Sequence, residues 1–168
     1  DFFAALGEAA GDPRIAPAML SFIDQQGVPL LTFAPGKKGA WSLTQSRYAQ
    51  VGVTAPATAW KIPVCARQGL ARECILLDGP AATLKLGTKG PVMPNAGGTG
   101  YYRFELPAKQ WDALIETADT LNGAEAMALS DSLLASFAAG RASPAQLIAA
   151  AEKLGKNPDR YARGVALD

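Results

Sequence analysis

Histidine is absent from this chain of 168 residues. Catalytic arrangements such as Ser-His-Asp and Cys-His use histidine as the base, so neither can be assembled here. A zinc site would also lack its commonest nitrogen ligand. Charge of one sign is not in excess either, because 16 basic and 15 acidic residues leave a net charge of +1. The chain therefore lacks the basic footprint that is typical of nucleic-acid-binding proteins.

A long apolar run and the basic start of a secretion signal are also missing. Because no stretch of eighteen apolar residues is present, no membrane span is predicted. The opening, Asp1-Phe2-Phe3-Ala4-Ala5-Leu6, has the pattern of a helix interior, and we expect the chain to be part of a longer one. A hydrophobic content of 49% with 18% charged residues favours a buried core over disorder.

Two short helices are predicted within residues 1–27. Apolar residues recur at helical spacing, and Gly11 ends the first helix. Pro17 lacks an amide hydrogen and is best tolerated in the first turn of the second helix. Gly27 ends that helix.

Short strands separated by turn residues are predicted from residue 28 to residue 106. Turn signals recur every eight to twelve residues, which is typical of an antiparallel sandwich. The expected strands are 28–33, 40–50, 60–67, 72–78 and 82–87, and residues 91–95 then lead into a glycine-rich turn.

After Pro107 the hydrophobic period becomes helical, and three amphipathic helices are predicted. Asn122, with Glu125 three residues on, can cap the second, and Ser143 with Gln146 can cap the third. Such helices bury their apolar faces only against one another. The predicted fold class is therefore α+β, with short N-terminal helices, a small antiparallel β-sandwich and a C-terminal helical bundle or the start of a solenoid.

The chain has two cysteines, Cys65 and Cys74, which lie equally far from the centre of the turn at residues 68–71. In a hairpin they would face each other as a non-hydrogen-bonded pair, roughly 4.5 Å apart at Cα, at the short end of disulfide geometry. A structural disulfide, two reduced cysteines and a metal site are the alternatives. A disulfide would indicate a periplasmic or secreted protein, and otherwise a cytoplasmic one is expected.

The segment from Pro94 to Leu106 is the most informative part of the chain. Three glycines within residues 97–100 indicate backbone with positive φ. The turn leads into a strand in which Tyr102, Phe104 and Leu106 alternate with Tyr101, Arg103 and Glu105. A phosphate-binding loop is disfavoured, because the Gly-Lys-[Ser/Thr] ending is missing and a strand follows instead of a helix.

This segment resembles the Asn-Ala-Gly-x-x-Gly-[Phe/Tyr]-Tyr-Arg stretch of the aminopeptidase-N-like (gluzincin) zinc aminopeptidases. Further pieces similar to that family occur in the same order along the chain: Gly27-Val28-Pro29, Gln45-Ser46-Arg47-Tyr48 and Trp60-Lys61-Ile62-Pro63. Gly98 stands where many members carry glutamine, and Glu125 stands where an arginine is expected.

The resemblance implies that residues 1–27 are the last helices of the catalytic domain, 28–107 the β-sandwich domain and 108–168 the start of the C-terminal helical domain. The family's His-Glu-x-x-His helix, its glutamate ligand and its Gly-x-Met-Glu-Asn strand lie upstream of all of these. The chain would thus be a non-catalytic part of an enzyme that removes N-terminal residues from peptides.

No catalytic, cofactor-binding or metal residue is then expected in this chain, and zinc would belong to the parent enzyme. The expected partners are the missing catalytic domain and, for the parent, peptide substrates. The residues expected to matter structurally are Cys65, Cys74, Asn95, Gly97, Gly100, Tyr102 and Arg103.

The competing hypothesis is a free-standing sandwich that binds a carbohydrate or a protein partner and carries a helical tail. Trp41, Trp60, Tyr48 and Tyr101 could form an aromatic platform for sugar, although aromatics in short strands more often lie in a core. Arg103 could clamp a substrate carboxylate, but pairing with Glu105, Asp78 or backbone carbonyls at the sandwich edge is favoured.

Overall fold

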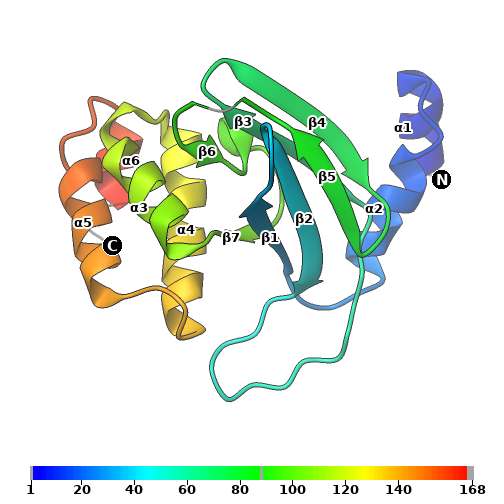
Figure 1. Cartoon of the computed structure of the whole chain (residues 1–168). Helices are drawn as coiled ribbons and strands as arrows, with labels where there is room; N and C mark the ends of the chain where they lie inside the picture. The colour runs from blue at the N-terminus through cyan, green and yellow to red at the C-terminus, as the bar shows by residue number, and fades with distance from the viewer. Residues whose placement is uncertain (1, 88, 166–168) are drawn as a thin grey trace.

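The computed structural model describes residues 2–87 and 89–165 and has mixed α+β architecture, which confirms the predicted fold class (Figure 1). Asp1, the start of the predicted first domain, and residues 166–168, the end of the predicted third domain, lie outside the described residues. The elements are α1 (Phe2–Ala10), α2 (Ile15–Ile23), β1 (Pro29–Pro35), β2 (Ala40–Arg47), β3 (Ile62–Gln68), β4 (Ala71–Leu77), β5 (Ala81–Lys85), β6 (Val92–Met93), the 3-10 turn η1 (Ala96–Gly98), β7 (Arg103–Glu105), α3 (Ala108–Glu116), the 3-10 turn η2 (Ala118–Thr120), α4 (Gly123–Ala138), α5 (Pro144–Leu154) and α6 (Arg160–Val165).

The strands form a sandwich of two small sheets, with strand orders β5-β2-β1-β7 and β4-β3-β6. All pairs are antiparallel except β1 with β7, which run parallel. The predicted sandwich was wholly antiparallel. The difference arises because the chain crosses from β6 in the second sheet before β7 reaches the free edge of β1, so no hairpin fixes the strand direction.

One hydrophobic core runs from the sandwich into the C-terminal helices. The inner faces of the sheets bury Phe33, Leu43 and Val64 completely. At the end of this core, the ring of Phe104 on β7 stacks on Trp111 of α3, with ring centroids 5.2 Å apart. The small sandwich therefore shares part of its core with the helices. A domain of its size buries too little surface by itself.

The C-terminal helices pack on one another beside the edge strand β7 (Figure 1). The predicted capping box of α5 is present, because Ser143 accepts from the amide of Gln146 and the Gln146 side chain accepts from the amide of Ser143. The sequence reasoning missed α6, whose first turn is capped by the carboxylate of Asp159.

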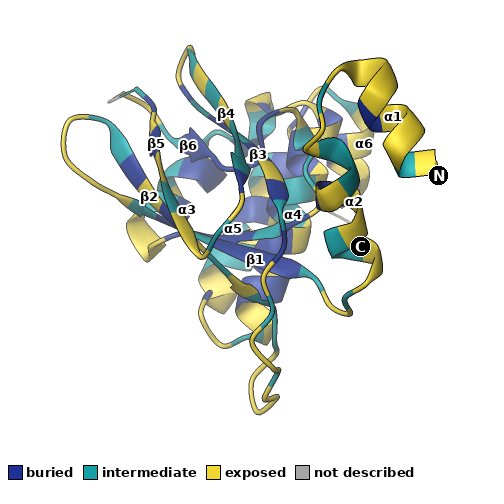
Figure 2. Cartoon of the chain, turned by 90° about the vertical axis from the view of Figure 1, so that its right-hand side faces the viewer, coloured by how far each residue is buried: buried dark blue, intermediate teal, exposed yellow. Residues whose placement is uncertain are grey.

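The hairpin α1–α2 lies at the opposite end of the molecule from these helices (Figure 1). Its links to the sandwich include hydrogen bonds from the Lys61 amide to Ser21 and from Gln25 to the carbonyl of Ala59. Large apolar side chains remain in solvent, with Phe2 71% and Ile23 62% exposed, and Figure 2 shows α1 almost wholly exposed. The two predicted N-terminal helices are therefore present, but several of their large apolar side chains are not packed against the rest of the chain.

Candidate functional site: the junction of the sandwich and the helices

The residues from the informative segment meet the C-terminal helices in one polar cluster, here called the junction. It is built from the loop between β6 and β7, the first residue of β7, the end of β3 and residues 123–131 of α4. Its members are Arg67, Asn95, Gly97, Gly98, Gly100, Tyr102, Arg103, Glu125 and Asp131.

The turn itself is held closed by Asn95, which is 2% exposed. Its side-chain amide donates to the carbonyl of Gly100 at 2.9 Å, and its oxygen accepts from the Gly100 amide at 2.9 Å. Gly97 and Gly98 have φ of 78° and 64°, so the prediction of left-handed backbone is confirmed at both positions. At Gly98 a Cβ would also overlap the backbone carbonyl of Ala124 on α4. The glycine there lets the loop touch the helix backbone.

The same prediction is wrong for Gly100, which does not have positive φ. Its lack of a side chain has another reason, because a Cβ would overlap the ring of Tyr102. The Tyr102 hydroxyl donates to the carbonyl of Pro94 at 2.9 Å and lies 3.5 Å from that of Cys65. Burial raises the pKa of Tyr102 well above its ordinary value, although a hydrogen bond with the backbone of Cys65 opposes this. Tyr102 therefore acts as a neutral, buried brace.

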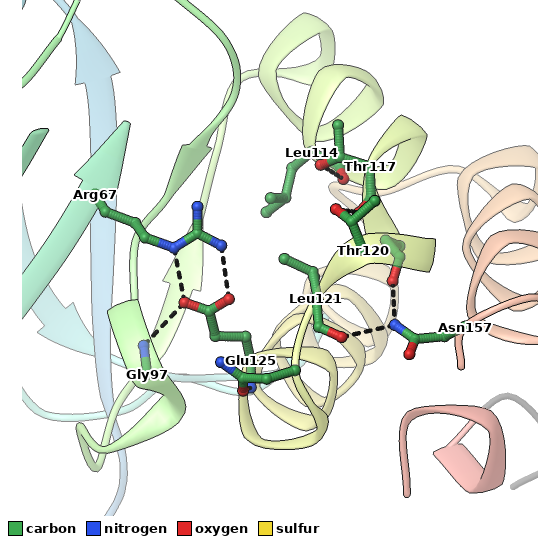
Figure 3. Close-up of polar contacts among 10 residues, drawn as sticks. Arg67, Gly97, Leu114, Thr117, Thr120, Leu121, Glu125 and Asn157 are labelled. Atoms are coloured by element: carbon green, nitrogen blue, oxygen red, sulfur yellow. Dashed lines mark hydrogen bonds and ion pairs between the residues drawn. The ribbon is translucent and has the colours of Figure 1, made fainter. Parts of the chain in front are cut away.

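Glu125 forms the centre of the junction (Figure 3). Its carboxylate, on a residue only 3% exposed, accepts two hydrogen bonds from Arg67, at 2.8 and 2.6 Å, and one from the amide of Gly97 at 2.9 Å. Burial opposes ionisation, but the hydrogen bonds from Arg67 and Gly97 and the attraction of Arg67 and Arg72 outweigh it, so the pKa of Glu125 lies below its ordinary value.

This arrangement alters the predicted cap of α4. Asn122 does accept from the amide of Glu125 at 2.9 Å, as expected. The Glu125 side chain, however, points across to the sandwich instead of back to its own helix. A tertiary ion pair has replaced the local capping contact, which sequence spacing alone does not indicate.

The prediction that Arg103 pairs with Glu105, Asp78 or backbone carbonyls is wrong. Its guanidinium makes a two-point contact with Asp131 on α4, at 3.0 and 2.9 Å, and lies 4.5 Å from the ring centroid of Tyr48. The hydrogen bonds to Asp131 raise the pKa of Arg103. Asp78 pairs instead with Lys61.

Glu105, the other expected partner of Arg103, is itself a buried residue that sequence reasoning missed. It faces the helices and accepts from Trp111 Nε1 at 2.8 Å and from the Ser136 hydroxyl at 2.9 Å. Its second carboxylate oxygen lies 3.6 Å from Nε of Arg141.

Cys65 and Cys74 form a disulfide, which decides among the three alternatives. They are direct partners in the β3–β4 register, with Cα atoms 4.1 Å apart. The symmetry about the turn therefore gave the right pairing.

The aromatic platform is not formed by the tryptophans. Trp41 and Trp60 are 3% and 2% exposed, and Trp41 Nε1 donates to the buried amide oxygen of Gln68. Tyr48 lies under Arg103. Only Tyr101 of the four presents a mostly exposed ring, and it contacts Phe22 edge-on. The two tryptophans are therefore core residues, as is usual for aromatics in short strands.

The junction offers structural contacts instead of reactive groups. A cavity of about 480 Å³ opens beside it, bounded by Tyr101, Arg103, Met127 and Asp131. The arginines there are already paired with carboxylates. Among the described residues, no three potential metal ligands of the histidine, cysteine, aspartate and glutamate type lie together.

Two further observations bear on function. In the described part of the chain, no helix is long and apolar enough to cross a bilayer. The sequence matches none of the known protein-family models, and a search of curated proteins gives no significant match.

Proposed function

We propose that this chain is the non-catalytic rear portion of a zinc aminopeptidase of the aminopeptidase-N-like type. It would join a catalytic domain to a C-terminal helical domain and hold the two in a fixed arrangement. The observation that carries the proposal is the segment Asn95–Arg103, whose resemblance to that family covers the residues that lock the sandwich to α4.

The order of the elements supports the same proposal. A helix pair, a small sandwich and a set of packed helices follow one another along the chain. The apolar residues left exposed on α1 and α2, among them Phe2, Met19 and Ile23, suit a face that a preceding domain covers. That domain would carry the zinc and the catalytic glutamate.

The residues present do not fit a zinc site of their own. Histidine is absent, and both cysteines are in the disulfide, so the usual nitrogen and sulfur ligands are missing. No step of peptide hydrolysis is assigned to this chain. The disulfide also supports placing the parent enzyme in an oxidising compartment, the periplasm or the cell exterior.

The test is the reading frame upstream of residue 1 and the activity of its product. We expect a His-Glu-x-x-His motif there, and chelator-sensitive hydrolysis of an aminoacyl-anilide by the longer protein. This chain alone should neither hydrolyse the anilide nor bind zinc at micromolar concentration. A signal peptide directly before residue 1, with no such motif, would contradict the proposal and favour a free-standing binding module.

A further inference from the structure

The Cys65–Cys74 disulfide has a setting that the junction does not explain. The bond lies on the outer face of the β3–β4 hairpin, where Cys74 is exposed and Cys65 half-buried. Both cysteines line a cavity of about 380 Å³ that lies between the hairpin and the start of α2. A small molecule can therefore approach the sulfur atoms without the sandwich opening.

The charged side chains around the disulfide favour the approach of an anion. Arg67 and Arg72 are register partners on β3 and β4, two residues from each cysteine and on the same face. Glu125 neutralises one of these two guanidiniums. The Arg14–Asp12 pair at the cavity wall is neutral as a unit. One uncompensated positive charge therefore remains beside the disulfide.

The disulfide cross-links strand β4 to β3. Strand β4 is an edge strand, hydrogen-bonded within its sheet to β3 alone. Further ties to the sandwich are the contact between the Glu73 carboxylate and the amide of Lys85 at the end of β5, and the packing of Ile75 and Leu77 in the core. Breaking the bond would leave the β3–β4 register held by the ladder, by the tight turn at Gly69 and Leu70, and by the buried end of β4 at Leu77.

We propose that Cys65–Cys74 is a thiol–disulfide exchange site that reacts in the folded protein with a small anionic thiol. Partly exposed sulfur in positively charged surroundings is the environment in which cysteine reacts readily. The inference does not depend on the aminopeptidase role.

The reaction is a two-step exchange. The thiolate of the incoming molecule attacks Sγ of Cys74, the Cys65–Cys74 bond breaks, and Cys65 leaves as a thiolate that takes a proton from water. A second thiolate then attacks the sulfur of the bound small molecule, which departs as its own symmetrical disulfide, and Cys74 is protonated. The protein disulfide gains two electrons, and two thiol molecules supply them.

The test measures the rate of reduction by glutathione under native conditions. The purified protein is mixed with increasing glutathione, samples are alkylated, and the mass increase counts the free thiols. We expect the rate to rise in proportion to the glutathione concentration. A rate that is independent of glutathione would mean that unfolding must come first, and it would overturn the proposal, as would a disulfide that reacts only in denaturant.

The role of charge is tested with Arg72→Gln and, as a matched control, Lys109→Gln on α3, an exposed residue at the other end of the molecule. At low ionic strength, Arg72→Gln should slow reduction by glutathione at least about twofold and slow reduction by 2-mercaptoethanol less, because the attacking thiolate of 2-mercaptoethanol carries one negative charge and that of glutathione carries two. Equal slowing with both thiols, or by Lys109→Gln, would contradict recognition of the anion.

The consequence for the fold is tested by hydrogen exchange. The double variant Cys65→Ser/Cys74→Ser, or the native protein after reduction, should exchange amides of β4 faster than the oxidised protein, while α4 remains unchanged. Equal amide exchange rates of β4 in the oxidised and reduced proteins would contradict the proposed effect of the disulfide on the edge strand. Because reduction uses the native protein, this result does not depend on the variant folding.

Discussion

At the scale of single residues, Glu125 is the more buried of the two carboxylates in the junction. Its side chain is 4% exposed, and Arg67, its partner, is 34% exposed. Removing one charge of such a pair leaves the other without a partner in a partly buried place. The loss of stability therefore exceeds that for a surface ion pair. Arg103 and Asp131 offer the comparison, because Asp131 is 58% exposed and solvent weakens that pair.

We therefore expect Glu125→Gln to lower the free energy of unfolding by about 2 kcal/mol. The control Asp131→Asn should lower it by less than about 1 kcal/mol. Urea denaturation followed by circular dichroism measures both. Equal effects for the two variants would show that the buried pair has no special role.

Gly98 is the glycine whose replacement should be worst tolerated. Gly98→Ala combines left-handed backbone with overlap against the Ala124 carbonyl, and we expect a loss of about 3 kcal/mol. Gly52 has φ of 79° but open space around its Cα, so Gly52→Ala should cost about 1 kcal/mol or less. Thermal denaturation of the two variants checks the difference, and similar midpoints would mean that the overlap is relieved by movement of the loop.

At the scale of secondary-structure elements, the C-terminal helices are tied together by Asn157. Its buried amide donates to the carbonyls of Ala118 and Leu121 in the connection between α3 and α4, at 2.8 and 2.7 Å (Figure 3). Its oxygen accepts from the amide of Asp159 just before α6. One side chain thus joins three helices through backbone groups.

Asn157→Ala should cost about 2–3 kcal/mol, because two buried carbonyls lose their donors. Ser143→Ala removes only a cap at the exposed start of α5 and should cost about 1 kcal/mol. Chemical denaturation of both variants gives the comparison. A smaller effect for Asn157→Ala than for Ser143→Ala would contradict the assigned role.

The α1–α2 hairpin is the element least held by the rest. Gly7 is the buried residue of α1, whereas α4 buries Ala126, Leu129 and Leu133. Local opening is easiest where few apolar contacts are lost. We expect amides of α1 to exchange with solvent much faster than those of α4 in the isolated chain, as followed by mass spectrometry. Protection of α1 equal to that of α4 would count against an uncovered docking face.

At the scale of the whole molecule, stability should depend on pH through Glu125. Its pKa in the folded protein lies below its ordinary value, so its contribution is fully present above the unfolded pKa of about 4.3. That contribution is lost as the pH falls through the folded value.

The free energies of unfolding of the native protein and of Glu125→Gln should therefore differ near neutral pH and converge below about pH 4. Denaturation curves over this range test the expectation. A difference that persists unchanged in acid would place the effect of the variant in packing instead of in charge.

Features that depend on neighbours along the chain could be predicted from the sequence. The capping of α5 by Ser143 and Gln146, the facing of Cys65 and Cys74 across a short turn, and the positive φ of Gly97 follow from local geometry. The α+β fold class followed from hydrophobic periodicity for the same reason.

Contacts between groups that are distant along the chain could be identified only in the folded protein. Arg67 and Glu125 are 58 residues apart, and Arg103 and Asp131 are 28 apart. No local rule selects one carboxylate among many at such separations, because the choice depends on how β7 docks on α4. The need for glycine at position 100 could likewise not be predicted from the sequence, because it depends on where the ring of Tyr102 lies.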